Sequence, residues 1–136
     1  MHKGRIGIVA RSTALVDEVG RQLSAHGLGA SKVVCLQDAD GDEQDSHLAL
    51  LKMFNAHWGT DAVLLLGAID AHEEEACTAW LRKHSSKPVI GYIDAADPAH
   101  AQRERLRASG VHVSADAAAI GALAATLVDP PWLPFD

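Results

Sequence analysis

The residues best suited to binding a ligand follow the first apolar run of the chain. Ile6–Ala10 is apolar apart from Gly7, and Arg11, Ser12 and Thr13 come directly after it. Apolar residues then recur at helical spacing, so a hydroxyl of this triplet can cap the first turn of a helix. The unpaired N–H groups and positive dipole end of such a helix attract anions. The triplet is therefore either a helix cap with a surface arginine or a site for a small anion, such as phosphate, a carboxylate or the phosphate of a nucleotide.

A second group of chemically active residues is acidic. The segment 37–45 contains Asp38, Asp40 and further carboxylates, and Asp70 follows a later apolar run. Clustered carboxylates suit Mg²⁺ or Ca²⁺, but a solvated loop is the simpler interpretation. Gly41 stands at the wrong position for a calcium loop, and no glutamate closes the motif. The sequence assigns no metal ligand and leaves Asp38, Asp40 and Asp70 as the candidates to test.

The eight histidines show no zinc-binding pattern. His26, His57 and His84 fall near expected helix ends, where a partial positive charge is favourable, so we expect capping roles for them. His72 and His100 fall nearer the carboxyl edge of the expected sheet, and His100 is the one candidate for catalysis. The sequence contains no phosphate-binding P-loop, no dinucleotide-binding glycine motif and no nucleophile elbow.

The elements that must position these residues alternate from end to end. The pattern predicts strands at 6–10, 32–36, 61–67, 89–93 and 111–113, and helices at 13–26, 46–57, 70–84, 98–109 and 116–128. Strands separated by helices of this length form a parallel sheet with helices on both faces. We therefore expect an α/β fold of three layers, α/β/α, with a five-stranded parallel sheet in the flavodoxin-like order 2-1-3-4-5.

Length and composition limit the class of protein. The chain has 136 residues, 48% hydrophobic residues and a formal net charge of −6. This predicts one domain spanning residues 1–136, without a nucleic-acid surface and without a membrane span. The N-terminal apolar run is too short for a secretory signal, so we expect a cytoplasmic protein whose two cysteines are buried free thiols. The apolar tail, residues 130–136, either packs on the domain or forms a partner surface.

Several blocks of the sequence also resemble a known family. GRIGIVARSTALVDEV at the start, QLSAHGLGAS, DAVLLLGAID, KPVIGYI, ASGVHV and DAAAIGALAATL are similar in order and spacing to the ligase domain of the succinyl-CoA synthetase alpha subunit and related NDP-forming acyl-CoA synthetases. The resemblance covers nearly the whole chain and implies a flavodoxin-like fold. It also implies a partner, since an alpha-subunit relative normally works against a second subunit.

The sequence departs from the family pattern at the residues that carry out the family's reaction. The family phosphorylates a histidine within a Gly-His-Ala-Gly motif of a long loop after the fourth strand, and a glutamate in Gly-Glu-Ile-Gly after the third strand orients it. Here the segment 94–101 is short and lacks glycine, with His100 nearest to the motif, and Ala68 stands where the glutamate belongs. The family's Ser-Gly-Thr at the first helix is replaced by Ser12–Ala14, which removes a glycine that permits close approach to a phosphate.

Two functions follow from these observations. The first is a stand-alone ligase-like domain, a pseudo-enzyme candidate without the phosphohistidine site, that depends on a partner or binds a small anion. The second is a subunit of an NDP-forming acyl-CoA ligase that another chain completes. The sequence identifies no cofactor and leaves the partner open between a second ligase subunit and a homodimer. We expect the CoA-binding domain that precedes the ligase domain in the family to be missing here.

Overall fold

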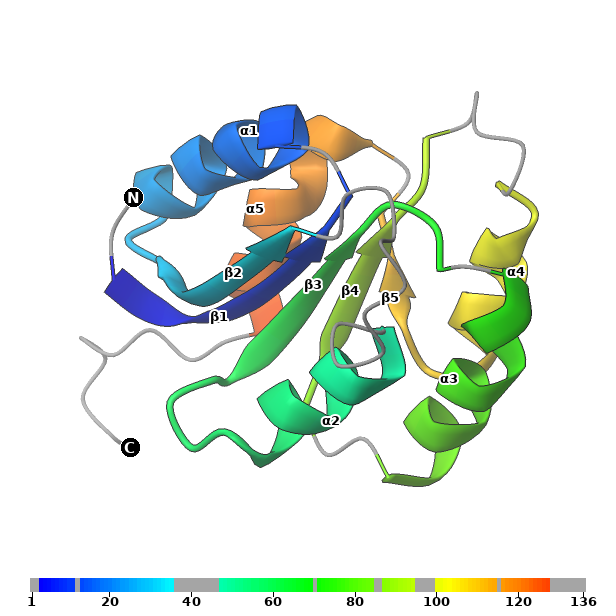
Figure 1. Ribbon diagram of the computed structural model, residues 1–136. Coiled ribbons are helices and arrows are strands. Elements are labelled where there is room, and N and C mark those ends of the chain that lie inside the picture. The colour runs from blue at the N-terminus through cyan, green and yellow to red at the C-terminus, as the bar shows by residue number, and fades with distance from the viewer. Residues whose placement is uncertain are drawn as a thin grey trace.

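A five-stranded parallel sheet forms the centre of the molecule. The computed structural model describes residues 3–11, 13–35, 47–69, 71–84, 87–94, 100–114 and 116–127. Its strands are β1 (Lys3–Ala10), β2 (Ala30–Cys35), β3 (Ala62–Leu66), β4 (Val89–Tyr92) and β5 (His112–Val113). They pair in parallel in the order β2-β1-β3-β4-β5 (Figure 1). The predicted fold class and strand order are confirmed.

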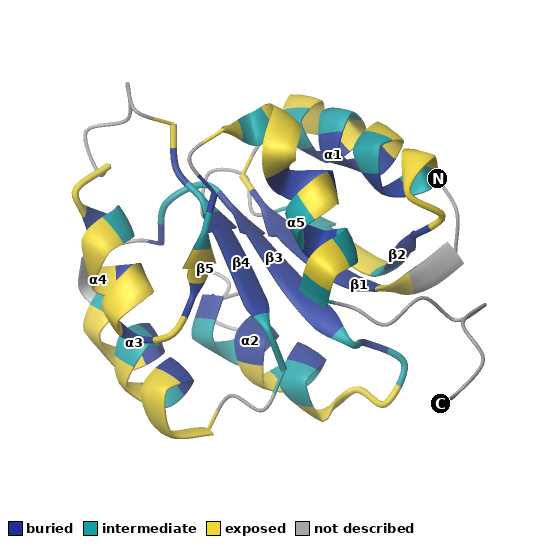
Figure 2. Cartoon of the chain, turned by 180° about the vertical axis from the view of Figure 1, so that it is seen from behind, coloured by how far each residue is buried: buried dark blue, intermediate teal, exposed yellow. Residues whose placement is uncertain are grey.

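Helices cover both faces of this sheet (Figures 1 and 2). On one face lie α1 (Thr13–Ala25) and α5 (Ile120–Leu127), and on the other lie α2 (His47–Ala56), α3 (Ala71–His84) and α4 (Gln102–Ala108). Each face has its own cluster of buried apolar side chains, which gives the three layers that the sequence predicts. Among the described helices, none is both long and apolar enough to cross a bilayer.

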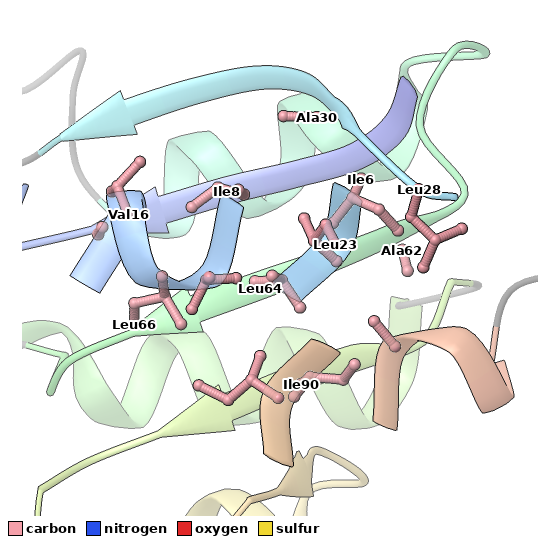
Figure 3. Close-up of a cluster of buried hydrophobic side chains, with 14 residues drawn as sticks. Ile6, Ile8, Val16, Leu23, Leu28, Ala30, Ala62, Leu64, Leu66 and Ile90 are labelled. Atoms are coloured by element: carbon pink, nitrogen blue, oxygen red, sulfur yellow. The ribbon is translucent and has the colours of Figure 1, made fainter. Parts of the chain in front are cut away.

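The alternation of side chains along each strand explains the two clusters. Ile6 and Ile8 of β1 point into the cluster beneath α1 and α5, whereas Val9 belongs to the cluster on the other face (Figure 3). Every residue of β3 is buried, because helices cover both of its faces. Four consecutive apolar residues without alternation, Val63–Leu66, are typical of such a central strand.

Local sequence signals set most of the element boundaries. After α1, Gly27 adopts a φ of 74°, and the N–H of Leu28 returns to the carbonyl of Leu23 at 2.7 Å, as expected for a glycine-terminated helix. The carboxylate of Asp116 accepts the N–H of Ala118 at 2.9 Å and caps a short 3-10 turn (Ala117–Ala119) that leads into α5. The fourth helix begins at Gln102, later than the predicted residue 98.

Close contacts fix how two helices sit. Gly7 of β1 leaves room for the ring of Phe54 on α2, because a Cβ at Gly7 would lie only 2.5 Å from that ring. Gly121 of α5 leaves room for Gln22 of α1, because a Cβ at Gly121 would lie only 2.5 Å from the Cβ of Gln22. The N–H of Gly121 donates to the side-chain oxygen of Gln22 at 2.7 Å. These glycines are therefore required by packing. The segment 37–45 and the tail 130–136 lie outside the described residues.

Candidate functional site

The loops that follow β1 and β3 diverge at the carboxyl edge of the sheet. The two strands are neighbours and end in register, with Ala10 opposite Leu66. The chain then enters α1 on one face after β1, and α3 on the other face after β3. Such a switch point leaves a crevice in which open α/β sheets bind their ligands.

Arg11 spans this switch point. Its backbone N–H donates to the carbonyl of Leu66 at 3.1 Å, and its side-chain Nε donates to the carbonyl of Ala68 at 2.9 Å. Between these two contacts the Arg11 side chain passes over Gly67. A Cβ added at Gly67 would lie 3.4 Å from the Cβ of Arg11, and the φ of Gly67 is 112°. The exposed guanidinium of Arg11 is thus tied to the loop after β3 as well as to its own strand.

The start of α1 lies directly beside Arg11. Thr13 is the first residue of the helix and is exposed, and the first turn of α1 contains no acidic residue. By contrast, the first turn of α3 carries Glu73 and Glu74, which offset the positive end of its dipole. Of the three predicted anion-binding residues, Arg11 and Thr13 are described, while Ser12 lies outside the described residues.

A buried glutamine holds the loop after β3 from the other side. Gln102, at the start of α4, is 1% exposed. Its side-chain oxygen accepts the N–H of Ile69 at 2.9 Å, and its side-chain nitrogen donates to the carbonyl of Ile69 at 2.8 Å and to Glu74 Oε1 at 3.1 Å. Sequence reasoning missed Gln102, because a glutamine in a polar helix carries no signal of a partner 33 residues away.

An ion pair completes this arrangement. Arg105 of α4 donates to both carboxylate oxygens of Glu74 on α3, with Nη2 3.0 Å from Oε1. The side chain of Glu74 is 15% exposed. The hydrogen bonds from Arg105 and Gln102 lower the pKa of Glu74, so it is ionised at neutral pH and retains both partners.

The predicted catalytic candidate, His100, precedes the first residue of α4 by two positions. His100 is exposed and lies in the turn before α4, where its carbonyl accepts the N–H of Arg103 at 3.0 Å. The turn leads into a helix on the α3 face, whereas Arg11 leads into α1 on the opposite face.

The metal candidates are not placed by the structure. Asp38, Asp40 and Asp70 lie outside the described residues. Within the part of the chain that is described, no group of three or more His, Cys, Asp or Glu residues could hold a metal ion. One carboxylate at this edge, Asp116, already caps the turn before α5.

Two further titratable groups are held in their neutral forms. Burial and the carboxylates of Asp94 and Asp116 raise the pKa of Tyr92 at the end of β4, so its hydroxyl stays protonated at neutral pH. Burial and the carboxylate of Glu73 raise the pKa of Cys77 to about 12, which makes it unreactive as a nucleophile. Cys77 is a buried free thiol as predicted, whereas Cys35 is only half-buried.

Comparison with known proteins finds partial similarity to the alpha subunit of succinate–CoA ligases. The succinate–CoA ligase [ADP-forming] alpha subunit of Aquifex aeolicus is 38% identical over 91 residues, which are 67% of this chain and 30% of the relative. The same subunit of Staphylococcus epidermidis (strain ATCC 12228) is 35% identical over the same shares. The chain thus spans less than a third of the length of these relatives. No family model matches it.

Solved structures share the fold. ATP citrate lyase of Methanosaeta concilii superposes with a TM-score of 0.75 at 16% identity, over 93% of this chain and 24% of that chain. The dinucleotide-forming acetyl-coenzyme A synthetase 1 of Ca. Korarchaeum cryptofilum superposes with a TM-score of 0.67 at 16% identity, over 85% of this chain and 28% of that chain. The chain is therefore a homologue of part of the succinate–CoA ligase alpha subunit, with the five-stranded fold that these ligases and lyases share.

Proposed function

We propose that this chain is a ligase-like domain that lacks the phosphohistidine site of its relatives, binds a small anion at Arg11 and the start of α1, and works with a partner chain. The observation that supports the proposal most is the residue at position 68, in the loop after β3, and its hydrogen bond with Arg11. By the resemblance, Ala68 stands where the family carries a glutamate, and its carbonyl accepts a hydrogen bond from Arg11 Nε. A methyl side chain cannot orient a histidine, and a cation is tied to the loop where the family places an anion.

The position of His100 supports the loss of phosphoryl transfer. Nine residues, 93–101, separate the end of β4 from the start of α4, and none of them is glycine. His100 is the second to last of these residues, two positions before the start of α4. A histidine that carries phosphate between two sites needs a long, permissive loop, and this connection is short.

The anion part of the proposal rests on charge and helix geometry. Arg11 supplies a permanent positive charge whose planar guanidinium suits phosphate and carboxylate. The adjacent N-terminus of α1 has no acidic residue in its first turn to compete with a bound anion. The names of the relatives include CoA and ADP, both of which carry phosphate groups.

Calorimetry with inorganic phosphate at low ionic strength tests the anion site. We expect saturable heat with the native chain and its loss in Arg11→Met. Arg21→Met is the matched control, because Arg21 is an exposed arginine of α1 whose Nη2 donates to Glu18 Oε1 of the same helix at 2.7 Å. Absence of heat with the native chain, or equal loss in both variants, would remove the anion site from the proposal.

The second candidate is a subunit of an NDP-forming acyl-CoA ligase that another chain completes. Its supporting observation is that the relatives are themselves named as subunits of a ligase. Purified chain is incubated with labelled ATP, CoA and a set of carboxylic acids, together with the products of its neighbouring genes. Label on His100 that disappears in His100→Asn, or acyl-CoA formation, would favour this candidate. If a complex forms but shows neither labelled His100 nor acyl-CoA, the ligase-like domain without the phosphohistidine site is favoured.

A further inference from the structure

Gln102 is buried, polar and distant in sequence from the loop that it holds. We propose that Gln102 is a positioning residue, which fixes one peptide group after β3 and thereby the orientation of the Arg11 side chain. The inference rests on the proposed anion site for its function, but its geometric part stands on described contacts alone.

The peptide group between Ala68 and Ile69 links the two side chains. Gln102 accepts the Ile69 N–H at 2.9 Å, and Arg11 Nε donates to the Ala68 carbonyl at 2.9 Å. This N–H and this carbonyl belong to the same planar, trans peptide group and point to opposite sides of it. Holding the N–H therefore also aims the carbonyl, and the carbonyl aims the guanidinium.

Gly67 makes such a restraint necessary. It precedes this peptide group with a φ of 112°, and a glycine loses more conformational freedom on folding than other residues. Gln102 holds the loop at two points, since it also donates to the Ile69 carbonyl at 2.8 Å. The two bonds restrain the peptide groups on both sides of Ile69, so the loop cannot rotate about one contact alone.

The amide of Gln102 is itself held in one orientation. Its nitrogen donates to Glu74 Oε1 at 3.1 Å, and Arg105 holds the same carboxylate. A flipped amide would direct its oxygen at the carboxylate and its N–H at the N–H of Ile69, so both contacts would become repulsive. The ion pair between α3 and α4 thus fixes the orientation of the Gln102 amide. The amide fixes the orientation of the Ala68–Ile69 peptide group, and this group fixes the orientation of the Arg11 side chain.

The consequence for binding is pre-organisation of a flexible cation. An arginine side chain loses considerable rotamer freedom when it is fixed, and a site that has already fixed it binds its ligand more tightly. Removing the restraint should weaken anion binding about 3- to 10-fold, the cost expected for ordering one long side chain. A merely structural role for Gln102 would change stability without moving Arg11.

The experiment compares Gln102→Met with Ser109→Ala. Methionine keeps the length of the side chain but loses all three hydrogen bonds. Ser109→Ala removes one buried hydrogen bond at the C-terminal end of the same helix, from the Ser109 hydroxyl to the Leu106 carbonyl at 2.7 Å. Phosphate affinity is measured by calorimetry, and the Nε–H signal of Arg11 by nitrogen-edited NMR. We expect Gln102→Met to weaken binding and to shift the Nε–H signal or hasten its exchange, with neither change in Ser109→Ala.

The outcomes separate the two proposals. If the native chain binds no phosphate, the proposed anion site is wrong, and the Nε–H signal alone decides whether Gln102 positions Arg11. If the native chain binds phosphate and Gln102→Met leaves both affinity and signal unchanged, the positioning role is overturned. Should Gln102→Met not fold, hydrogen exchange in the native chain decides, because a rapidly exchanging Ile69 amide contradicts the restraint and a protected one supports it.

Discussion

Gly7→Ala should destabilise the fold through one contact. A Cβ on Gly7 would lie 2.5, 2.6 and 2.8 Å from three ring atoms of Phe54, whereas ordinary contact begins near 3.4 Å. Phe54 is 1% exposed, so its ring has to withdraw about 1 Å within a close-packed interior. Such overpacking costs about 1–3 kcal/mol, against which alanine regains roughly 0.5–1 kcal/mol of the conformational freedom that glycine loses in a strand.

A double-mutant cycle isolates that contact. Phe54→Ala alone should cost about 3–5 kcal/mol, the usual loss for a buried phenylalanine. In the Phe54→Ala background the ring is gone, so Gly7→Ala should cost nothing or stabilise slightly. We therefore expect a favourable coupling of about 1–3 kcal/mol between the two substitutions. Urea unfolding followed by far-UV circular dichroism measures each free energy of unfolding, provided that the slope with denaturant stays constant.

Gly91→Ala provides the control. Gly91 lies in β4 of the same sheet, and its Cβ would meet Val111 at 3.1 Å and not Phe54. Its effect should be smaller than that of Gly7→Ala and should add to the effect of Phe54→Ala without coupling. If Gly7→Ala costs the same with and without Phe54, the contact between β1 and α2 does not account for the glycine, and the packing argument is refuted.

Three further predictions concern the carboxyl edge and the α3 face. Gly67→Ala should lower the free energy of unfolding by about 1–3 kcal/mol, because a φ of 112° is rarely adopted by residues other than glycine. The new Cβ would make no clash, so a cost that Phe54→Ala relieves would contradict this reason. Because Glu74 has a lowered pKa in the folded state, its stabilisation is present above the pKa of the unfolded chain and is lost as pH falls through the folded pKa. The difference in stability between the native chain and Glu74→Gln should therefore shrink from pH 7 to pH 3, and a constant difference would argue against the ion pair with Arg105. Cys77, with a pKa of about 12, should react with iodoacetamide only as fast as the chain unfolds. It should also make stability fall as pH rises above 9 by up to about 1.4 kcal/mol per unit, a contribution that Cys77→Ala should remove.

The predicted anion site shows where sequence reasoning stopped. The sequence predicts Arg11 and Thr13 from their place between an apolar run and a helical pattern, because strand, cap and helix are neighbours in the chain. The partners of Arg11 were not identified. Ala68 presents a backbone carbonyl, and every residue has one, so its type reveals nothing about the hydrogen bond that it accepts.

The boundary of the fourth helix was harder to predict for a similar reason. The proline at position 98 suits a first helical turn, and the sequence placed the start of the helix there. In the structure α4 begins at Gln102, where the buried amide binds the loop after β3. A long-range contact of this kind outweighs a local preference that is worth little by itself.

By itself, the sequence determined the five strands, their parallel order and the division into three layers, because hydrophobic periodicity and turn residues act locally and crossover handedness restricts the topology. Only the tertiary structure decided which side chains meet at the carboxyl edge. Arg11 and Gln102 bind the same peptide group. Arg11 is 57 positions from Ala68, whose carbonyl it binds, and Gln102 is 33 positions from Ile69, whose N–H it binds. Directional hydrogen bonds between such distant segments form only once the sheet has brought the ends of its strands together, and no periodicity in the chain records them.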